Sequence, residues 1–147
     1  MLELQRLVKL FERAGPLLDR LSTESLTDET VLRRAAEILD SMDATEQIAV
    51  INAHPRIGER PDQLSAASLR EQGASTPPEV RKRLAALNEE YEAKFGFRFV
   101  VFVNRRSTEA IVPLLEARLR GTIDEERRTA LREILAIAED RLKREEA

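Results

Sequence analysis

One run of strand-forming residues, FRFVVFV at residues 97–103, most limits the folds open to this chain. Its β-branched and aromatic side chains favour an extended backbone. A strand needs neighbouring strands to form a stable sheet, and the rest of the sequence offers no second run of this kind. The segment is therefore predicted to be a single buried extended stretch in an otherwise helical protein.

Apolar residues recur at helical spacing through most of the remaining sequence, which predicts about seven helices. The predicted helices begin near residues 2, 28, 43, 65, 77, 107 and 122. With 147 residues and 42% hydrophobic side chains, the chain has the size of one domain, and no linker or repeat divides it. The expected fold class is all-α: a single-domain helical bundle over residues 1–147 with one buried extended segment.

Capping residues predict where three of these helices begin. Asp43, with Glu46 three residues later, resembles a capping box, in which each side chain accepts a hydrogen bond from the other residue's backbone. Ser107 and Thr122 carry hydroxyls that are expected to begin the last two helices in a similar way.

Glycine and proline mark further boundaries. Thr76 is expected to cap the helix that ends at Gly96, where glycine favours the left-handed turn that closes a helix. Gly15 with Pro16 is expected to stop the first helix. Pro113 lacks a backbone donor, so it is expected to bend its helix or to delay the regular part.

The charge balance argues against nucleic acid as a partner. Lys and Arg number 24, Asp and Glu number 27, and the net charge is −3, without the basic excess that neutralises phosphates. The N-terminal stretch MLELQRLVKLFERAG carries charges throughout, unlike a signal peptide or a membrane span. The C-terminal REEA is no peroxisomal signal. We expect a cytoplasmic protein that binds neither nucleic acid nor membrane.

The single histidine, His54, lies in the stretch INAHPRIGER at residues 51–60. Proline disfavours helical geometry in the residue before it, so Pro55 is expected to leave His54 at a helix C-terminus. The helix dipole there favours the imidazolium by a few tenths to about 2 kcal/mol, and a carboxylate such as Glu71 would favour it further. His54 is then a positioned acid or an anion-binding cation, or it merely caps the helix and packs against the following loop.

Composition also limits other kinds of site. With one histidine and no cysteine, only carboxylates remain to complete a metal site, and no acidic run has calcium-loop spacing. No Gly-x-Ser-x-Gly elbow and no glycine-rich phosphate loop is present. A bound metal is therefore not expected.

An ordered set of motifs is similar to a known family. The motifs are AHPRIG at residues 53–58, SLREQ at 68–72, NEEYEAKFGFRFVVFV at 88–103, EARL at 116–119 and EDRL at 139–142. In this order and spacing they resemble the OHCU decarboxylase family, which acts on 2-oxo-4-hydroxy-4-carboxy-5-ureidoimidazoline in urate breakdown. The family's fold is all-α with one extended stretch.

The resemblance implies which residues act on the substrate. It places the catalytic histidine at His54, with Glu71 as the partner of the imidazole, and it implies that Pro55 contacts the ligand. Taken alone, Glu71 is an ordinary helix former on a solvated face.

The resemblance also implies a set of substrate-binding groups. Ser68 and Gln72 are implied to hold the ureido and ring atoms, and Arg141 to meet the substrate anion. Taken alone, Arg141 could instead interact with the negative end of its helix dipole, or it could pair with a nearby acid. Backbone groups of the extended segment are implied to line the pocket, at Phe99, Val100, Val101, Phe102 and Val103. Asn88 and Tyr91 are family-typical residues that we assign to structure.

The activity implied is that of a carboxy-lyase: cofactor-free decarboxylation that yields (S)-allantoin, in a possible homodimer. The ring imine takes up the electrons released with CO2, so the substrate is its own electron sink. Two alternatives stay open: a non-catalytic helical protein-binding module, and a divergent decarboxylase of a related ureide or imidazole carboxylate. The second is prompted by the N-terminal FERAGPLLDRL, which lacks the tryptophan usual in the family.

Overall fold

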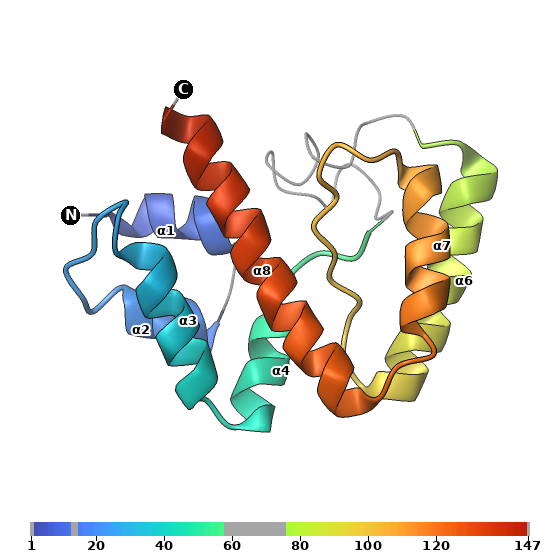
Figure 1. Ribbon diagram of the computed structural model, residues 1–147, viewed down its shortest axis with the longest axis horizontal. Helices are drawn as coiled ribbons and strands as arrows, with labels where there is room; N and C mark the ends of the chain where they lie inside the picture. The colour runs from blue at the N-terminus through green and yellow to red at the C-terminus, as the bar shows by residue number, and fades with distance from the viewer. Residues whose placement is uncertain (1, 13–14, 58–75, 147) are drawn as a thin grey trace. The chain divides into compact units, whose positions relative to one another are not determined.

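The computed structural model describes residues 2–12, 15–57 and 76–146, which form two compact units (Figure 1). The first unit consists of Met1–His54 and Leu131–Ala147, and the second of Pro55–Ala130. Within the described residues there are seven helices and no strand, so the all-α prediction is confirmed. The single domain over residues 1–147 remains a prediction.

Four short helices and the end of a long one build the first unit. They are α1 (Leu4–Phe11), α2 (Pro16–Leu21), α3 (Val31–Ser41), α4 (Ala44–Asn52) and the part of α8 (Ile123–Glu146) from Leu131 onward. Helix α2 packs against α1, α3 and α4 (Figure 1). The apolar faces of these helices are buried against one another. This burial of apolar surface is the main contribution to the stability of such a unit. The core side chains include Leu7, Leu10, Phe11, Leu17, Leu21, Ala35, Ile38, Leu39, Val50, Ile51, Ile134 and Ala138.

Helix α2 is absent from the sequence-based prediction, which treats Gly15 and Pro16 only as a stop. The first helix does end before them, at Phe11, but Pro16 also begins α2. Proline is favourable at a first helical position because the N–H of that position has no partner within the helix. The helix has only six residues, too few for a helical period to stand out.

Helix α4 begins as predicted and leads to the histidine. The Asp43 carboxylate accepts a hydrogen bond from the Glu46 N–H at 2.8 Å, and the Glu46 carboxylate accepts one from the Asp43 N–H at 3.5 Å. The helix ends at Asn52, and the His54 N–H still donates to the Ile51 carbonyl at 3.2 Å. The prediction that His54 lies at a helix C-terminus is therefore confirmed.

The second unit contains α6 (Pro78–Phe95), α7 (Thr108–Arg118) and the first turns of α8. Helices α6 and α7 pack side by side (Figure 1). Residues 97–103 form neither helix nor strand and run as an extended trace in Figure 1. Phe97, Phe99, Val100, Val101 and Val103 are buried within this segment. The predicted buried extended stretch is thus present.

Three of the predicted helix boundaries are also present in the second unit. Gly96 closes α6 in the left-handed conformation, with φ of 80°. The Ser107 hydroxyl accepts from the Ala110 N–H at 3.2 Å at the start of α7. The Thr122 hydroxyl accepts from the Glu125 N–H at 3.2 Å at the start of α8. Local capping chemistry therefore sets these ends.

One expectation in this unit is wrong, and so is part of a second. The residue that precedes α6 is Pro77, which makes no side-chain capping bond, while the Thr76 hydroxyl lies 3.3 Å from the Thr108 hydroxyl instead. Pro113 does not delay the regular part of α7, because the helix already begins at Thr108, while the bend expected as the other possibility stays a prediction.

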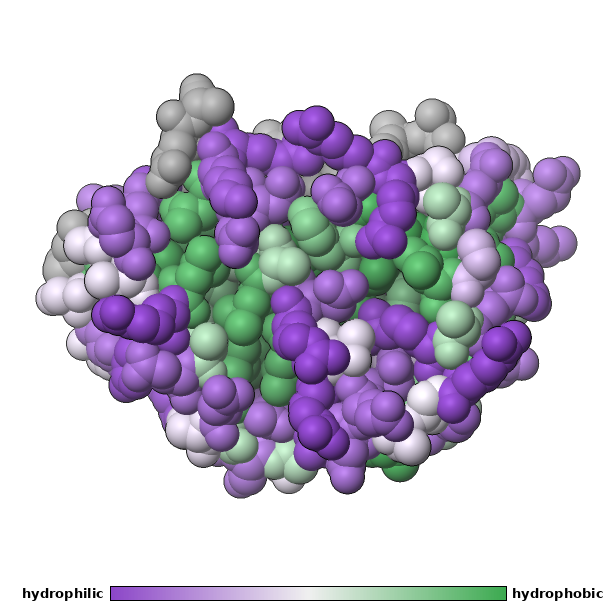
Figure 2. Space-filling view, viewed as in Figure 1, coloured by the Kyte–Doolittle hydropathy of each residue, from purple (hydrophilic) through white to green (hydrophobic). Residues whose placement is uncertain are grey.

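Hydrophilic side chains cover most of the face seen in Figure 2, with smaller hydrophobic areas between them. Among the described residues, the large hydrophobic side chains that are exposed are Leu4, Val8 and Ile123. None of the helices described in the structure combines the length and the apolar composition needed to cross a membrane.

Candidate functional site

His54 lies at the end of α4 with 3% of its surface exposed. Its Nδ1 atom is 3.5 Å from the Val50 carbonyl oxygen, one turn earlier in the same helix. A carbonyl oxygen can only accept a hydrogen bond, so this contact favours the tautomer with the proton on Nδ1. The lone pair of Nε2 is then the basic site of the ring.

A buried ion pair belongs to the same unit as His54. Glu12, directly after α1, accepts a hydrogen bond at Oε1 from Nη2 of Arg141 in α8 at 2.9 Å. Arg141 Nη1 donates to the carbonyl oxygens of Lys9 at 3.1 Å and Leu10 at 3.5 Å. Those carbonyls end α1 and have no helical donor of their own, so the guanidinium caps the helix.

Burial and the neighbouring charges set the protonation state of the imidazole. Burial lowers the pKa of His54 most, because the charged ring loses its hydration, and the Arg141 guanidinium lowers it further. The Glu12 carboxylate and the Val50 carbonyl oppose this change, and the resulting pKa is about 4. The helix dipole alone is expected to favour the imidazolium, but here burial and Arg141 outweigh it. His54 is neutral at pH 7.

Glu12, the partner of Arg141, is a residue that the sequence-based reasoning missed. It lies 129 residues from Arg141, and no periodicity or motif connects positions so far apart. The predicted alternative that Arg141 pairs with a nearby acid is what the structure contains. Its proposed contact with a substrate anion stays a prediction.

The other predicted site residues of this part of the chain fall into two groups. Pro55 follows His54 directly and is half-buried. Ser68, Glu71 and Gln72 lie outside the described residues, so the predicted pairing of Glu71 with the imidazole stays a prediction.

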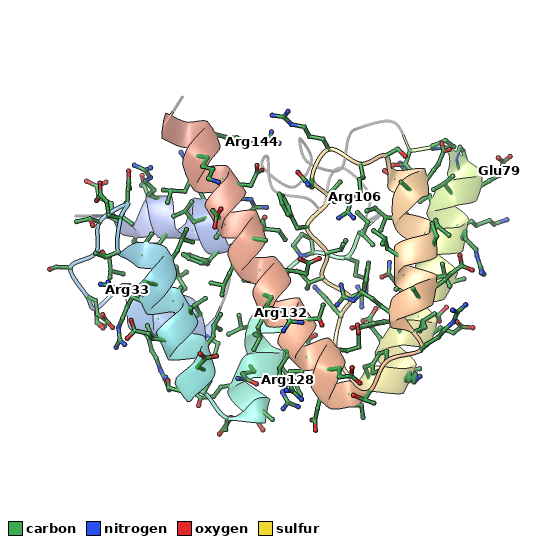
Figure 3. All side chains as sticks on the ribbon, viewed as in Figure 1. Arg33, Glu79, Arg106, Arg128, Arg132 and Arg144 are labelled. Carbon is green, nitrogen blue, oxygen red and sulfur yellow. The ribbon has the colours of Figure 1, made fainter. Side chains whose placement is uncertain are left out.

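Arginine side chains hold the backbone of the extended segment in the second unit. Arg118 Nη1 donates to the Val100 carbonyl at 2.7 Å, and its guanidinium carbon lies 4.5 Å from the centre of the Phe99 ring. Arg106, labelled in Figure 3, donates through Nε to the Val103 carbonyl at 2.9 Å and through Nη2 to the Phe102 carbonyl. The backbone of the segment is thus fixed by side chains rather than by a sheet. Its predicted role in lining a pocket, at residues 99–103, stays a prediction.

Asn88 makes a structural contact, as assigned from the sequence. Its Nδ2 group donates to the Ile57 carbonyl oxygen at 3.0 Å, and the side chain is buried. The bond joins the middle of α6 to the stretch that follows His54 and Pro55 in the sequence. Within the described part of the chain, no group of three or more histidine or carboxylate side chains is placed to hold a metal ion.

Comparison with known proteins places these features in a family. The family model described as OHCU decarboxylase matches residues 3–143. The 2-oxo-4-hydroxy-4-carboxy-5-ureidoimidazoline decarboxylase of Haloferax volcanii is 33% identical over 116 residues, which cover 77% of this chain and 67% of that protein. The protein of the same name from Halalkalicoccus jeotgali is 34% identical over 101 residues, which cover 66% of this chain and 57% of that protein.

A solved structure has the same fold. It is the crystal structure of an OHCU decarboxylase in the presence of (S)-allantoin, with a TM-score of 0.78 and 24% sequence identity, and the match covers 95% of this chain and 96% of that chain. The family model spans nearly all of the sequence, including His54 and Arg141. This chain therefore belongs to the OHCU decarboxylase family, as its motifs predict.

Proposed function

We propose that this chain catalyses the cofactor-free decarboxylation of 2-oxo-4-hydroxy-4-carboxy-5-ureidoimidazoline to (S)-allantoin. Membership of the family supports the reaction, since the similar proteins from Haloferax volcanii and Halalkalicoccus jeotgali carry that name. The observation that carries the chemistry is a buried neutral imidazole at a helix end, whose pKa is lowered first by burial and then by the Arg141 guanidinium.

The substrate supplies its own electron sink. When the bond between the ring carbon and the carboxylate breaks, CO2 leaves, and the electron pair moves through the adjacent carbon onto the ring imine nitrogen. The enzyme must orient this bond, stabilise the developing charge, and deliver a proton to one face of the carbon that bears the ureido group. These tasks require polar side chains rather than a bound cofactor.

His54 is the group that moves the proton. As a neutral base, it accepts the proton of the substrate hydroxyl at Nε2, and the imidazolium so formed returns that proton to the ureido-bearing carbon. One further proton from solvent is taken up at the ring nitrogen, which balances the reaction. Proton transfer by a positioned side chain contributes on the order of 100-fold or more to the rate.

The remaining groups bind and orient the substrate in this proposal. Arg141 receives the substrate carboxylate, and Glu71 partners the imidazole once it is charged. Ser68 and Gln72 hold the ring and ureido atoms, together with Pro55. The extended segment contributes backbone groups at Phe99, Val100, Val101, Phe102 and Val103. A homodimer, a cytoplasmic location, and the lack of nucleic-acid or membrane partners stay predictions from the sequence.

The test follows the optical activity of the product. The unstable substrate is generated in the cuvette from urate by urate oxidase and hydroxyisourate hydrolase, and circular dichroism reports the chiral product. The wild-type chain should hasten its formation, and His54→Ala should lower the rate by about 100-fold or more. Thr45→Ala, on the exposed surface of the same helix, is the matched control and should retain the wild-type rate.

Two results would contradict the proposal. A folded wild-type chain that does not accelerate the appearance of the chiral product favours a non-catalytic helical module, or a decarboxylase of a related ureide or imidazole carboxylate. Full activity in His54→Ala would remove the imidazole from the reaction.

A further inference from the structure

We propose that Glu12 is a positioning residue of this site, which holds the Arg141 guanidinium, in the same unit as His54, in the orientation that receives the substrate carboxylate. The inference rests on the proposed decarboxylation. It adds a residue that none of the family motifs identified in the sequence contains.

The contacts of Arg141 fix the plane of its guanidinium. Nη2 is bound to Glu12, and Nη1 to the carbonyl oxygens of Lys9 and Leu10. A guanidinium is planar and rigid, so anchoring both terminal nitrogens also fixes the directions of its other N–H bonds. The Arg141 and Glu12 side chains are 4% and 11% exposed, where a charge-assisted hydrogen bond is stronger than it is in water. Glu12 therefore removes the rotational freedom that a long arginine side chain otherwise has.

The backbone of Glu12 indicates that its side chain is needed at this position. Its φ of 56° and ψ of −147° lie in a region that is essentially restricted to glycine, because a Cβ atom crowds the backbone there. Glycine would adopt this conformation without strain. The chain nevertheless carries glutamate, and its carboxylate is turned onto Arg141.

Stability alone is a weak explanation for this arrangement. The loss of hydration of a buried ion pair largely cancels the attraction between its charges, so such pairs often add little to the free energy of unfolding. Here the pair also depends on a strained backbone. Orienting a buried cation that acts on the imidazole gives Glu12 a role that an apolar residue cannot fill.

Glu12 also balances the charge that faces the imidazole. Among the described residues, the charged groups that act on His54 are Arg141 from α8 and Glu12 from the end of α1. If Glu12 becomes neutral, the imidazole loses the carboxylate that favours its charged form, and protonation of His54 becomes harder. The imidazolium intermediate of the proposed reaction would then be less stable.

The experiment compares Glu12→Gln and Glu12→Asp with a matched control, Glu24→Gln. Glu24 accepts two hydrogen bonds from Arg34 at 2.7 and 3.0 Å in the same unit, in a partly exposed pair that does not act on His54. The steady-state constants kcat and KM are measured, and NMR follows the titration of the imidazole. Because the sequence has one histidine, the imidazole signals need no assignment.

Glu12→Gln keeps an oxygen acceptor for Arg141 Nη2 but removes the negative charge, so the guanidinium is held less firmly. KM should rise about tenfold, the difference between a charge-assisted and a neutral hydrogen bond, with a smaller change in kcat. The substitution should also move the His54 titration to lower pH. Glu12→Asp keeps the charge but draws the carboxylate back by one methylene. Its KM should therefore lie between that of the wild type and that of Glu12→Gln. Glu24→Gln should leave KM and the titration unchanged.

A folded Glu12→Gln chain with unchanged KM and an unchanged His54 titration overturns the proposal. If Glu12→Gln does not fold, Glu12→Asp tests the proposal in its place. A wild-type KM in Glu12→Asp then overturns the proposal as well. If the wild-type chain shows no decarboxylation at all, the proposed function fails by itself. The titration then still tests the link from Glu12 to His54, because it needs no substrate.

Discussion

The Tyr91 hydroxyl donates a hydrogen bond to Glu126 Oε1 across 2.6 Å, and both residues are buried. The same carboxylate oxygen accepts from Arg118 Nε at 2.8 Å, and Arg118 also donates to the Val100 carbonyl. Three side chains thus connect α6, α7 and the first turns of α8 with the extended segment. Burial is the main cause that raises the pKa of Tyr91, so the hydroxyl stays protonated and can donate.

Removing Tyr91 or Glu126 from this network should lower the free energy of unfolding by unequal amounts. Tyr91→Phe removes one hydrogen bond but leaves the ring in place and Glu126 paired with Arg118, so it should lower the free energy of unfolding by about 1–3 kcal/mol. Glu126→Ala leaves a buried arginine without its carboxylate and should cost about 3–5 kcal/mol. Urea denaturation of the two single variants and of the double variant measures the loss of unfolding free energy in each. Equal losses of unfolding free energy in the two single variants would contradict the expectation that Glu126→Ala is the more destabilising.

Features set by neighbouring residues were predictable from the sequence. The capping box of Asp43 and Glu46, the caps at Ser107 and Thr122, and the left-handed Gly96 all depend on chemistry within a few residues. The lone strand-like run was correctly expected to remain a single buried segment, since nothing else in the sequence can pair with it. The position of His54 at a helix end follows from the proline after it.

Features that depend on distant residues were not predictable in this way. The pairing of Glu12 with Arg141 joins the two ends of the chain, and neither residue carries a local sign of the other. The protonation state of His54 follows from the same long-range contact and from burial, so the local dipole rule predicts the wrong direction. Helix α2 escaped prediction because Pro16 is interpreted only as a stop, and the six residues of the helix are too few for a helical period to stand out.

The Asp43 cap should contribute measurably to stability. Asp43→Ala removes the acceptor for the Glu46 N–H at the start of α4, and loss of such a cap costs about 0.5–2 kcal/mol. Asp43→Asn keeps an oxygen acceptor at the same position and should stay close to wild type. Urea denaturation at pH 7 measures both variants. An Asn variant as unstable as the Ala variant would show that the charge, rather than the hydrogen bond, is what matters.

Gly96 should be costly to replace for backbone reasons alone. Its φ is 80°, and a Cβ atom built on it meets no atom within 4 Å, so no clash would contribute. Gly96→Ala should destabilise by about 1–2 kcal/mol, the cost of a left-handed residue with a side chain. Gly96→Asn should cost less, because asparagine tolerates this conformation better. Thermal unfolding followed by circular dichroism tests the order, and an alanine variant as stable as wild type would rule out the backbone explanation.

Acid should destabilise the chain through His54. The pKa of His54 is about 4 in the folded chain, below the ordinary value of 6.5, so between these two pH values the unfolded chain binds more protons than the folded one. Stability therefore falls as the pH drops from about 6.5 to about 4, by roughly 3 kcal/mol from this group. His54→Gln cannot titrate, so the difference in unfolding free energy between wild type and variant should shrink or change sign over that range. Urea denaturation at pH 7, 6, 5 and 4 measures this difference, with any effect of the substitution on packing appearing as a constant offset. Parallel pH profiles for the two proteins would mean that the imidazole titrates normally in the folded chain and is not held neutral by burial and Arg141.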